Sequence, residues 1–296
     1  MRSQIGLQTF DTSTVGFGIV ANSFVNVTEA SPGYATRVLL GARAIRNTFG
    51  TSSPRSLITV RSLPYAEGTN AAFALAERSG IAPARVVSLG DHCAAIIDGL
   101  SMAASFAQSG LSPVALVAAD HFSEVVDARA SNAESKFSEW RNMAGCMRVE
   151  KGGRLRLKAI ASISNPAFSS MTTFNGAYLQ VDRQLAAAFK LIDLDAQIET
   201  IQALIRLSDV SLGQPFLCVT NRSMHRLEAL ASGLKGAARV VQSRDDHGHT
   251  GGSDILLNLM YALDSIADGT GNIICSANGL GYTWSSLLIE VHHGGE

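Results

Sequence analysis

The chain has 296 residues, of which 46% are hydrophobic and 17% are charged. This composition is typical of a globular protein with a large core, and it excludes a disordered or fibrous chain. The formal net charge is only -1 and the lysines and arginines are scattered, so we expect no nucleic-acid partner.

The cysteines stand far apart, at positions 93, 146, 218 and 275, without a Cys-x-x-Cys pair. This spacing indicates neither a zinc site nor a disulfide framework, and reduced thiols fit a cytoplasmic protein. The N-terminus lacks the pattern of a signal peptide, and no apolar stretch reaches the length of a membrane span. We therefore expect a soluble, cytoplasmic protein with no metal, no cofactor and no membrane partner.

Strands and helices alternate along the first half of the chain. The predicted strands are 14–22, 56–61, 85–89 and 113–119, and the predicted helices are 34–47, 66–78 and the stretch after Cys93 to about 108. A polar excursion, 120–142, follows. Strands 145–149 and 155–163, joined by Glu150-Lys151-Gly152-Gly153, are then expected to form a hairpin that closes this half.

The second half repeats this rhythm. It begins with a long helix at about 185–207, which we expect to be broken near Asp193. Strands 215–219, 239–242, 272–276 and 283–291 and helices 223–230 and 252–266 follow. The pattern predicts an α/β fold of two similar halves, 1–163 and 164–296, which share one core.

Cys93 lies where the strand 85–89 gives way to an apolar helix. The unpaired N–H groups and the positive dipole end of that helix favour a thiolate, which would make Cys93 a nucleophile. Free cysteine is also one of the residues most often buried in a core. From this stretch alone, Cys93 is therefore either a nucleophile or a residue that only packs in the core.

Three further stretches fall at strand ends in the second half. They are FLCVTNRSMHRL with Asn221, DDHGHTGGSD with His249, and IICSANGLGYTWSSLLIEV with Cys275 and a glycine turn. Together with the Cys93 stretch, they resemble the thiolase-like superfamily and its ketoacyl synthase III (3-oxoacyl-ACP synthase III) branch.

The resemblance extends over most of the chain from about Arg37 onward. The strand after the Cys93 helix ends in Ala119-Asp120, as in that branch, and Met143-Ala144-Gly145-Cys146 stands where the branch has an Asp-Gly-Ala-Gly turn. The resemblance implies the thiolase fold, whose two similar halves stack as layers of helix, sheet, helix, sheet and helix. It also implies a dimer, either a homodimer or a heterodimer with a related ketosynthase.

The activity that the resemblance implies is acyl transfer. Cys93 would take an acyl group from a thioester and pass it to a carbon nucleophile, forming a β-keto product of polyketide or fatty acid biosynthesis. Two alternatives remain open. One is an ester- or amide-forming acyltransferase, and the other is a non-catalytic partner subunit of a ketosynthase heterodimer.

The resemblance assigns catalytic roles to His249 and Asn221, in an order unlike that of the branch. Ketoacyl synthase III enzymes have His before Asn, whereas here Asn221 comes first, as in thiolases. His249 would help to form the thiolate or stabilise an oxyanion, and Asn221 would hold an oxygen or a water. The N–H of Cys93 and one from the turn Gly279 to Gly281 would form the oxyanion hole.

Cys275 has the spacing of a second thiolase cysteine, in a C-x-x-x-G-x-G turn, and is either a second thiol or a packing residue. His247 and His249 with Asp245 and Asp246 mimic a metal site, but no other cluster supplies the remaining ligands. His92 is expected to be structural or to line the pocket.

The N-terminal region lacks the Trp-containing segment that synthase III enzymes use around coenzyme A. The resemblance therefore favours acyl carrier protein over acyl-CoA as the donor. Together with the altered catalytic order, this points to specialised metabolism.

Overall fold

The computed structural model describes residues 5–10, 16–27, 37–62, 70–90, 93–122, 141–175, 178–221, 223–241, 248–266, 269–279 and 282–293. The described elements overlap with those expected from the sequence. The beginnings of the predicted helices 34–47 and 66–78, and most of the polar excursion, lie outside the described residues.

The first half of the chain builds a sheet with the strand order β4-β3-β5-β6-β2, in which β3 is parallel to β4 and β5. The elements of this half are β2 (Phe17–Val27), α1 (Arg37–Phe49), β3 (Ser56–Val60), α2 (Ala71–Ser79), β4 (Arg85–Leu89), α3 (Ala95–Gln108), β5 (Val114–Asp120) and β6 (Asn142–Lys151).

The second half repeats this arrangement with the order β11-β10-β12-β13-β7. Its elements are β7 (Leu155–Ser164), α5 (Arg183–Ile205), β10 (Phe216–Val219), α6 (Met224–Gly233), β11 (Arg239–Val241), α7 (Gly252–Ile266), β12 (Gly271–Asn278) and β13 (Thr283–Val291). The short additions are β1 (Gly6–Thr9) beside β7, the pair β8 (Thr172–Asn175) and β9 (Tyr178–Val181), and the 3-10 turns Pro166–Phe168 and Val210–Leu212. The expectation of two similar halves is confirmed.

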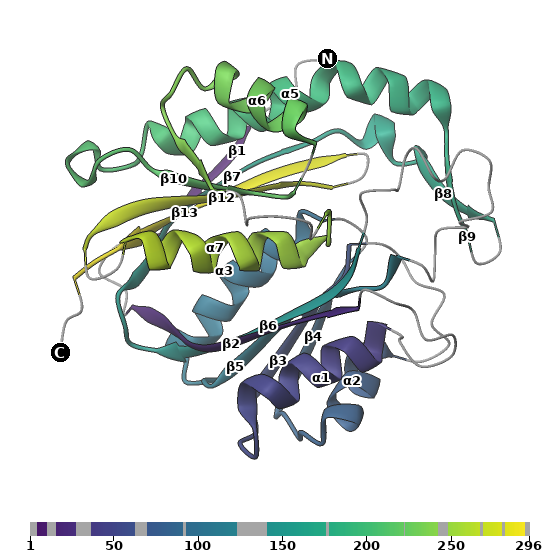
Figure 1. Ribbon diagram of the computed structural model, residues 1–296, viewed down its shortest axis with the longest axis vertical. Helices are drawn as coiled ribbons and strands as arrows, with labels where there is room; N and C mark the ends of the chain where they lie inside the picture. Colours follow the sequence, from purple (N-terminus) through teal and green to yellow (C-terminus); the bar gives the residue numbers. More distant parts are fainter. Residues whose placement is uncertain are drawn as a thin grey trace.

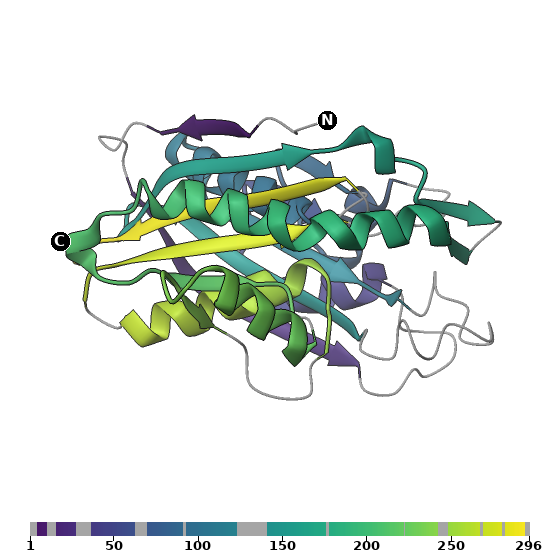
Figure 2. The same cartoon turned by 90° about the horizontal axis from the view of Figure 1, so that it is seen from above.

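The helices form the other layers. α3 and α7 lie between the two sheets, α1 and α2 cover one outer face, and α5 and α6 cover the other (Figure 1). Figure 2 shows α5 lying along the strands of the second sheet. Among the described residues, no helix is both long enough and apolar enough to span a membrane.

The largest core cluster surrounds the two middle helices. Ile96 and Leu100 of α3 and Leu256 and Leu259 of α7 are buried there among apolar residues from strands of both sheets. Full burial of each such side chain contributes roughly 1.5–3 kcal/mol, so this packing holds the two helices in place between the sheets. Their N-terminal ends carry the candidate site.

The expected break in the long helix is wrong, because α5 runs without interruption through Asp193. The Asp193 carboxylate faces inward, where it accepts hydrogen bonds from Trp284 Nε1 at 2.9 Å and from Asn278 Nδ2. It also pairs with Arg226 at 2.7 Å. These partners allow a charged residue in the helix interior to be buried.

The expected hairpin of 145–149 and 155–163 is also wrong. β6 pairs with β2 and β5, whereas β7 pairs along its length with β13, so the two strands enter different sheets. These two sheets are continuous with each other where β2 pairs with β7, at Phe17 and Leu155. The connection uses Gly152 and Gly153 at φ of 86° and 94°, a conformation that residues with side chains rarely adopt. The division of the chain at residue 163 stays a proposal, and this pairing favours a crossing at the glycine turn instead.

We predict that Asp193→Ala lowers the free energy of unfolding by about 3 kcal/mol, because it leaves Arg226 and the Trp284 N–H without their buried acceptor. Urea denaturation measures this change. Asp195→Ala, on the exposed side of the same helix, is the matched control and should change stability by less than about 0.5 kcal/mol. Equal stability of the two variants would contradict the structural role of Asp193.

Candidate active site

Cys93 and His249 come from different halves and meet between the sheets. Cys93 precedes α3 and is 3% exposed, and His249 precedes α7 and is 7% exposed. Cys93 Sγ lies 3.8 Å from His249 Nε2, and the imidazole ring stacks on Phe122 with ring centroids 5.9 Å apart. The thiol also faces the positive end of the α3 dipole, which favours a negative charge on sulfur.

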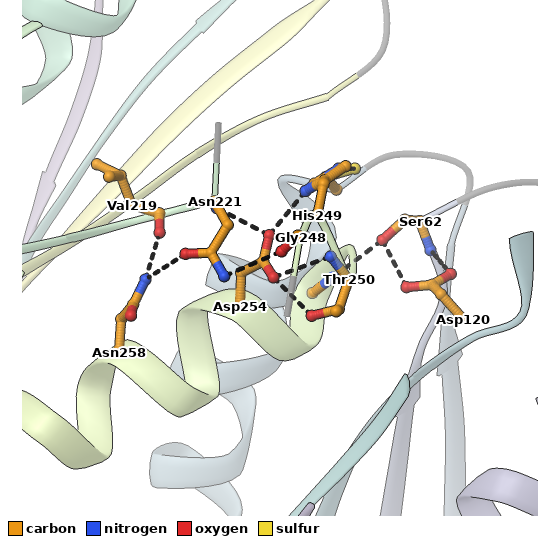
Figure 3. A network of polar contacts seen from close by, with 11 residues as sticks. Ser62, Asp120, Val219, Asn221, Gly248, His249, Thr250, Asp254 and Asn258 are labelled. Carbon is orange, nitrogen blue, oxygen red and sulfur yellow. Dashed lines mark hydrogen bonds and ion pairs between the residues drawn. The ribbon is translucent and has the colours of Figure 1, made fainter. Parts of the chain in front are cut away.

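A buried carboxylate holds the other side of the imidazole. His249 Nδ1 lies 2.7 Å from Asp254 Oδ2, and Asp254 stands fully buried in the first turn of α7 (Figure 3). A histidine that donates from Nδ1 to a carboxylate presents Nε2 to its other partner, here the sulfur of Cys93. Cysteine, histidine and aspartate thus form a continuous chain of polar contacts.

The same carboxylate organises the chain around the histidine. Asp254 Oδ1 accepts from the backbone N–H and the hydroxyl of Thr250, and Oδ2 accepts from the backbone N–H of Asn221 at 2.8 Å. Its place at a helix N-terminus favours a negative charge. Asp254 therefore fixes both the orientation of the ring and the backbone on either side of it.

Two effects act in opposite directions on the pKa of His249. Burial by itself lowers the pKa of His249, but the charge and hydrogen bond of Asp254 and the sulfur of Cys93 outweigh it and raise the pKa from 6.5 to about 10. At neutral pH the ring is consequently an imidazolium. A cationic ring beside Cys93 stabilises the thiolate that a nucleophile requires.

Asn221 lies beside this group and follows β10. Its Nδ2 donates to the carbonyl of Gly248 at 3.1 Å, and its Oδ1 lies 3.4 Å from Asn258 Nδ2, which also donates to Val219 (Figure 3). The structure therefore brings Asn221 together with the predicted His249. These contacts hold the segment that carries the histidine.

Cys275 lies in the core rather than among these contacts. It pairs in register with Cys218 across β12 and β10, and both are fully buried. Burial and the neighbouring Cys275 raise the pKa of the Cys218 thiol well above its usual value. This apolar setting favours the packing role for Cys275.

Of the remaining predicted site residues, the structure describes Gly279. The N–H of Gly279 donates to Thr283 at 2.7 Å and closes the glycine turn, so an oxyanion donor from this turn must be another amide. Gly281, His92 and the Asp245-Asp246-His247 segment lie outside the described residues. Within the described part of the chain, no cluster of three histidine, cysteine or acidic side chains suits a metal ion.

Sequence reasoning missed Asp254 and Asn258. A signal for Asp254 was present, because an acidic residue in the first turn of a helix, close after a histidine, can reach back to it. For Asn258 no local pattern distinguishes a buried amide from an exposed one.

No protein-family model and no curated protein matches the sequence. Solved structures do match over nearly the whole chain. The 3-oxoacyl-(acyl carrier protein) synthase III of Pseudomonas aeruginosa has a TM-score of 0.78 at 16% identity, covering 95% of this chain and 100% of that one. A 3-oxoacyl-(acyl carrier protein) synthase of Burkholderia xenovorans has a TM-score of 0.75 at 14% identity, covering 98% and 96%. An OleA variant of Xanthomonas campestris has 0.71 at 14% identity, covering 95% and 99%.

The chain has the thiolase fold. This confirms the fold that the sequence resemblance implied, in the form that the ketoacyl synthase III structures share. Within this thiolase fold, the candidate site uses the N-terminal ends of the two middle helices, one from each half.

We predict that Asp254→Asn slows alkylation of Cys93 by iodoacetamide at pH 7 by about tenfold or more, because the imidazole loses the charge that keeps it protonated. Peptide mass spectrometry measures the rate at Cys93. The exposed Asp264→Asn on the same helix is the matched control and should react like the wild type. An unchanged rate in Asp254→Asn would contradict the role of the carboxylate.

The raised pKa also predicts a pH dependence of stability. A histidine whose folded pKa is raised from 6.5 to about 10 stabilises the fold fully below pH 6.5, and this contribution is lost as pH rises toward 10. The difference in unfolding free energy between Cys93→Ala and Cys93→Ala/His249→Asn should therefore shrink as the pH rises above 6.5. It should be lost at a lower pH than in the wild type, because the sulfur of Cys93 contributes to the raised pKa and Asp254 alone remains. The Cys93→Ala background removes the ionisation of the thiol, and a difference that stays constant with pH would contradict the His249–Asp254 charge pair.

Proposed function

We propose that this protein is a cysteine-dependent acyltransferase, a condensing enzyme of the ketoacyl synthase III type. The observation that supports this most directly is the 3.8 Å approach of Cys93 Sγ to His249 Nε2, with Asp254 bonded to the other ring nitrogen. A thiol beside a histidine that a third group orients is the arrangement of an activated nucleophile. The likeness to 3-oxoacyl-(acyl carrier protein) synthase structures supports a thioester as the acyl donor.

In the first step, the Cys93 thiolate attacks the carbonyl carbon of the donor thioester. The new C–S bond forms, the donor C–S bond breaks, and the leaving thiolate takes the Nε2 proton of His249. The N–H of Cys93 and an amide of the glycine turn that follows β12 would stabilise the oxyanion of the intermediate. The product of this step is an acyl group on Cys93.

In the second step, a malonyl-type thioester loses carbon dioxide and its carbanion attacks the acyl carbonyl. A C–C bond forms, the bond to the sulfur of Cys93 breaks, and a β-keto thioester leaves. Before this step His249 takes a proton from water, which the charge and hydrogen bond of Asp254 favour because they raise the pKa of the ring. The protonated Nε2 can then donate a hydrogen bond to the developing enolate oxygen. The released thiolate then pairs with His249 again.

One observation favours a second candidate acceptor. A cysteine–histidine–aspartate chain also suits a histidine that removes a proton from a hydroxyl or an amine, which would give an ester or an amide. The charged state of His249 makes this the second choice. A non-catalytic partner subunit would not need the complete cysteine–histidine–aspartate chain.

We further propose acyl carrier protein as the donor rather than acyl-CoA, because the N-terminal region lacks the segment associated with coenzyme A. The protein would act as a homodimer or as a heterodimer with a related ketosynthase, in fatty acid or polyketide biosynthesis and more specifically in specialised metabolism. All its cysteines are free thiols, which supports a place in the cytoplasm.

Intact-protein mass spectrometry after incubation with acyl carrier protein and acyl-CoA thioesters tests this function. We predict a mass gain of one acyl group that is lost in Cys93→Ala. Cys146→Ala is the matched control and should acylate normally, because burial raises the pKa of the Cys146 thiol to about 12 despite an opposing hydrogen bond from Thr48. A further incubation with malonyl thioester, hydroxyl and amine acceptors would identify the product class.

Absence of a mass gain with every donor would contradict the acyltransferase and favour the partner subunit. An acyl group that remains in Cys93→Ala would contradict Cys93 as the nucleophile.

A further inference from the structure

Ser62 and Asp120 form a buried pair that the proposed mechanism does not use. Ser62 follows β3 and Asp120 ends β5, so both lie at the carboxyl ends of strands in the first sheet. Both are fully buried. Such a pair is costly to desolvate unless its polar atoms are bonded, so its contacts indicate what it stabilises.

The pair reaches across to the second half of the chain. The backbone N–H of Ser62 donates to Asp120 Oδ1 at 2.8 Å and its hydroxyl donates to Oδ2 at 2.7 Å. Figure 3 shows Ser62 beside Asp120. With its proton turned to the carboxylate, the Ser62 oxygen accepts from the backbone N–H of Gly252 at 3.0 Å. Gly252 is the first residue of α7, so the first half bonds an otherwise open N–H of that helix.

The residues just before α7 lie so close to Ser62 and Asp120 that position 251 requires glycine. A Cβ atom on Gly251 would lie 2.2 Å from Asp120 Oδ2 and 2.4 Å from Ser62 Oγ. Gly251 also has a φ of 69°, which L side chains rarely adopt. The start of α7 and the Ser62–Asp120 pair are therefore in close contact, with no space for a side chain at position 251.

Three more hydrogen bonds join α7 and the residues just before it to the first half. Ser253 Oγ donates to the carbonyl of Ala118 at 3.0 Å and accepts from the N–H of Gly145 at 3.1 Å. The backbone N–H of Arg141 donates to the carbonyl of His249 at 2.9 Å. Because Cys93 belongs to the first half and His249 to the second, these bonds join the same two parts of the chain as the contact between the two reacting groups does.

We propose that Ser62 and Asp120 are positioning residues, which hold the N-terminus of α7 against the first sheet and so set the separation of Cys93 Sγ and His249 Nε2. This inference rests on Cys93 as the nucleophile of the proposed function. It does not depend on the acyl donor or the acceptor. The pair acts through the backbone of α7 and touches neither reacting group in the contacts described above.

The test is the rate at which iodoacetamide alkylates Cys93 at pH 6, followed by peptide mass spectrometry. Ser62→Ala should slow this reaction by about tenfold, because a longer separation from the imidazolium of His249 weakens the stabilisation of the Cys93 thiolate. Thr200→Ala is the matched control, since Thr200 is a buried hydroxyl bonded to Ser286 on the far side of the second sheet. It should lose similar thermal stability and keep the wild-type rate.

A second pair of variants reaches the same contact from the helix side. Gly251→Ala pushes a methyl group into Ser62 and Asp120, whereas Gly80→Ala places one at a φ of 72° with no atom within 4 Å. Both variants bear a similar backbone strain, and Gly251→Ala adds the clash, so it should lose more stability than Gly80→Ala. The alkylation rates are therefore compared at a temperature where both variants are folded. Only Gly251→Ala should slow the alkylation of Cys93.

The proposal is overturned if folded Ser62→Ala and Gly251→Ala alkylate Cys93 at the wild-type rate although both have lost stability. It is also overturned if wild-type Cys93 reacts no faster than the other cysteines. Because alkylation needs no acyl donor, this experiment tests the positioning role of Ser62 and Asp120 independently of the proposed acyltransferase activity. A slow Ser62→Ala in a protein that accepts no acyl group would uphold the positioning pair and contradict the acyltransferase.

Discussion

The site depends on the buried carboxylate of Asp254. It bonds the imidazole of His249, both donors of Thr250 and the backbone of Asn221, and it lies in the first turn of a helix whose dipole favours its charge. Replacing water with these fixed donors lets a charged group exist in the core. The consequence is a histidine that is both oriented and charged, and hence able to support a thiolate.

The internal repeat explains why the reacting groups meet. Each half places a helix in the middle layer, and each reacting group lies shortly before such a helix: Cys93 is two residues before α3 and His249 is three residues before α7. Both helix ends carry partial positive charge, which favours a thiolate and later an oxyanion at the same place. Ser62 of the first half accepts from the first N–H of α7, and Asp120 orients the Ser62 hydroxyl. In the proposed account, this contact between the halves sets the geometry of the site.

Most of the fold could be predicted from local patterns, because apolar runs and helical periodicity are properties of short stretches. The two wrong predictions, the helix break and the hairpin, concern features that depend on contacts between residues far apart in the sequence. Asp193 looked like a helix break because its partners, Trp284 and Arg226, are far away in the sequence. The glycine turn before β7 indicated a hairpin, although strand pairing is settled by the sheets as a whole. Cys93 and His249 stood out through their motifs, whereas Asp254 is defined only by contacts that folding creates.

The protonation of the His249 ring is measured most directly by the nitrogen-15 NMR spectrum of histidine-labelled protein. The His249 signals are assigned as those that disappear in His249→Asn. We expect both ring nitrogens of His249 to carry protons at neutral pH and the ring to titrate far above 6.5, toward its pKa of about 10. The Nδ1 proton should show the shift of a hydrogen bond to a carboxylate, and this feature should vanish in Asp254→Asn. A neutral ring that titrates at an ordinary histidine pKa would contradict the central claim that Asp254 holds a charged histidine beside Cys93.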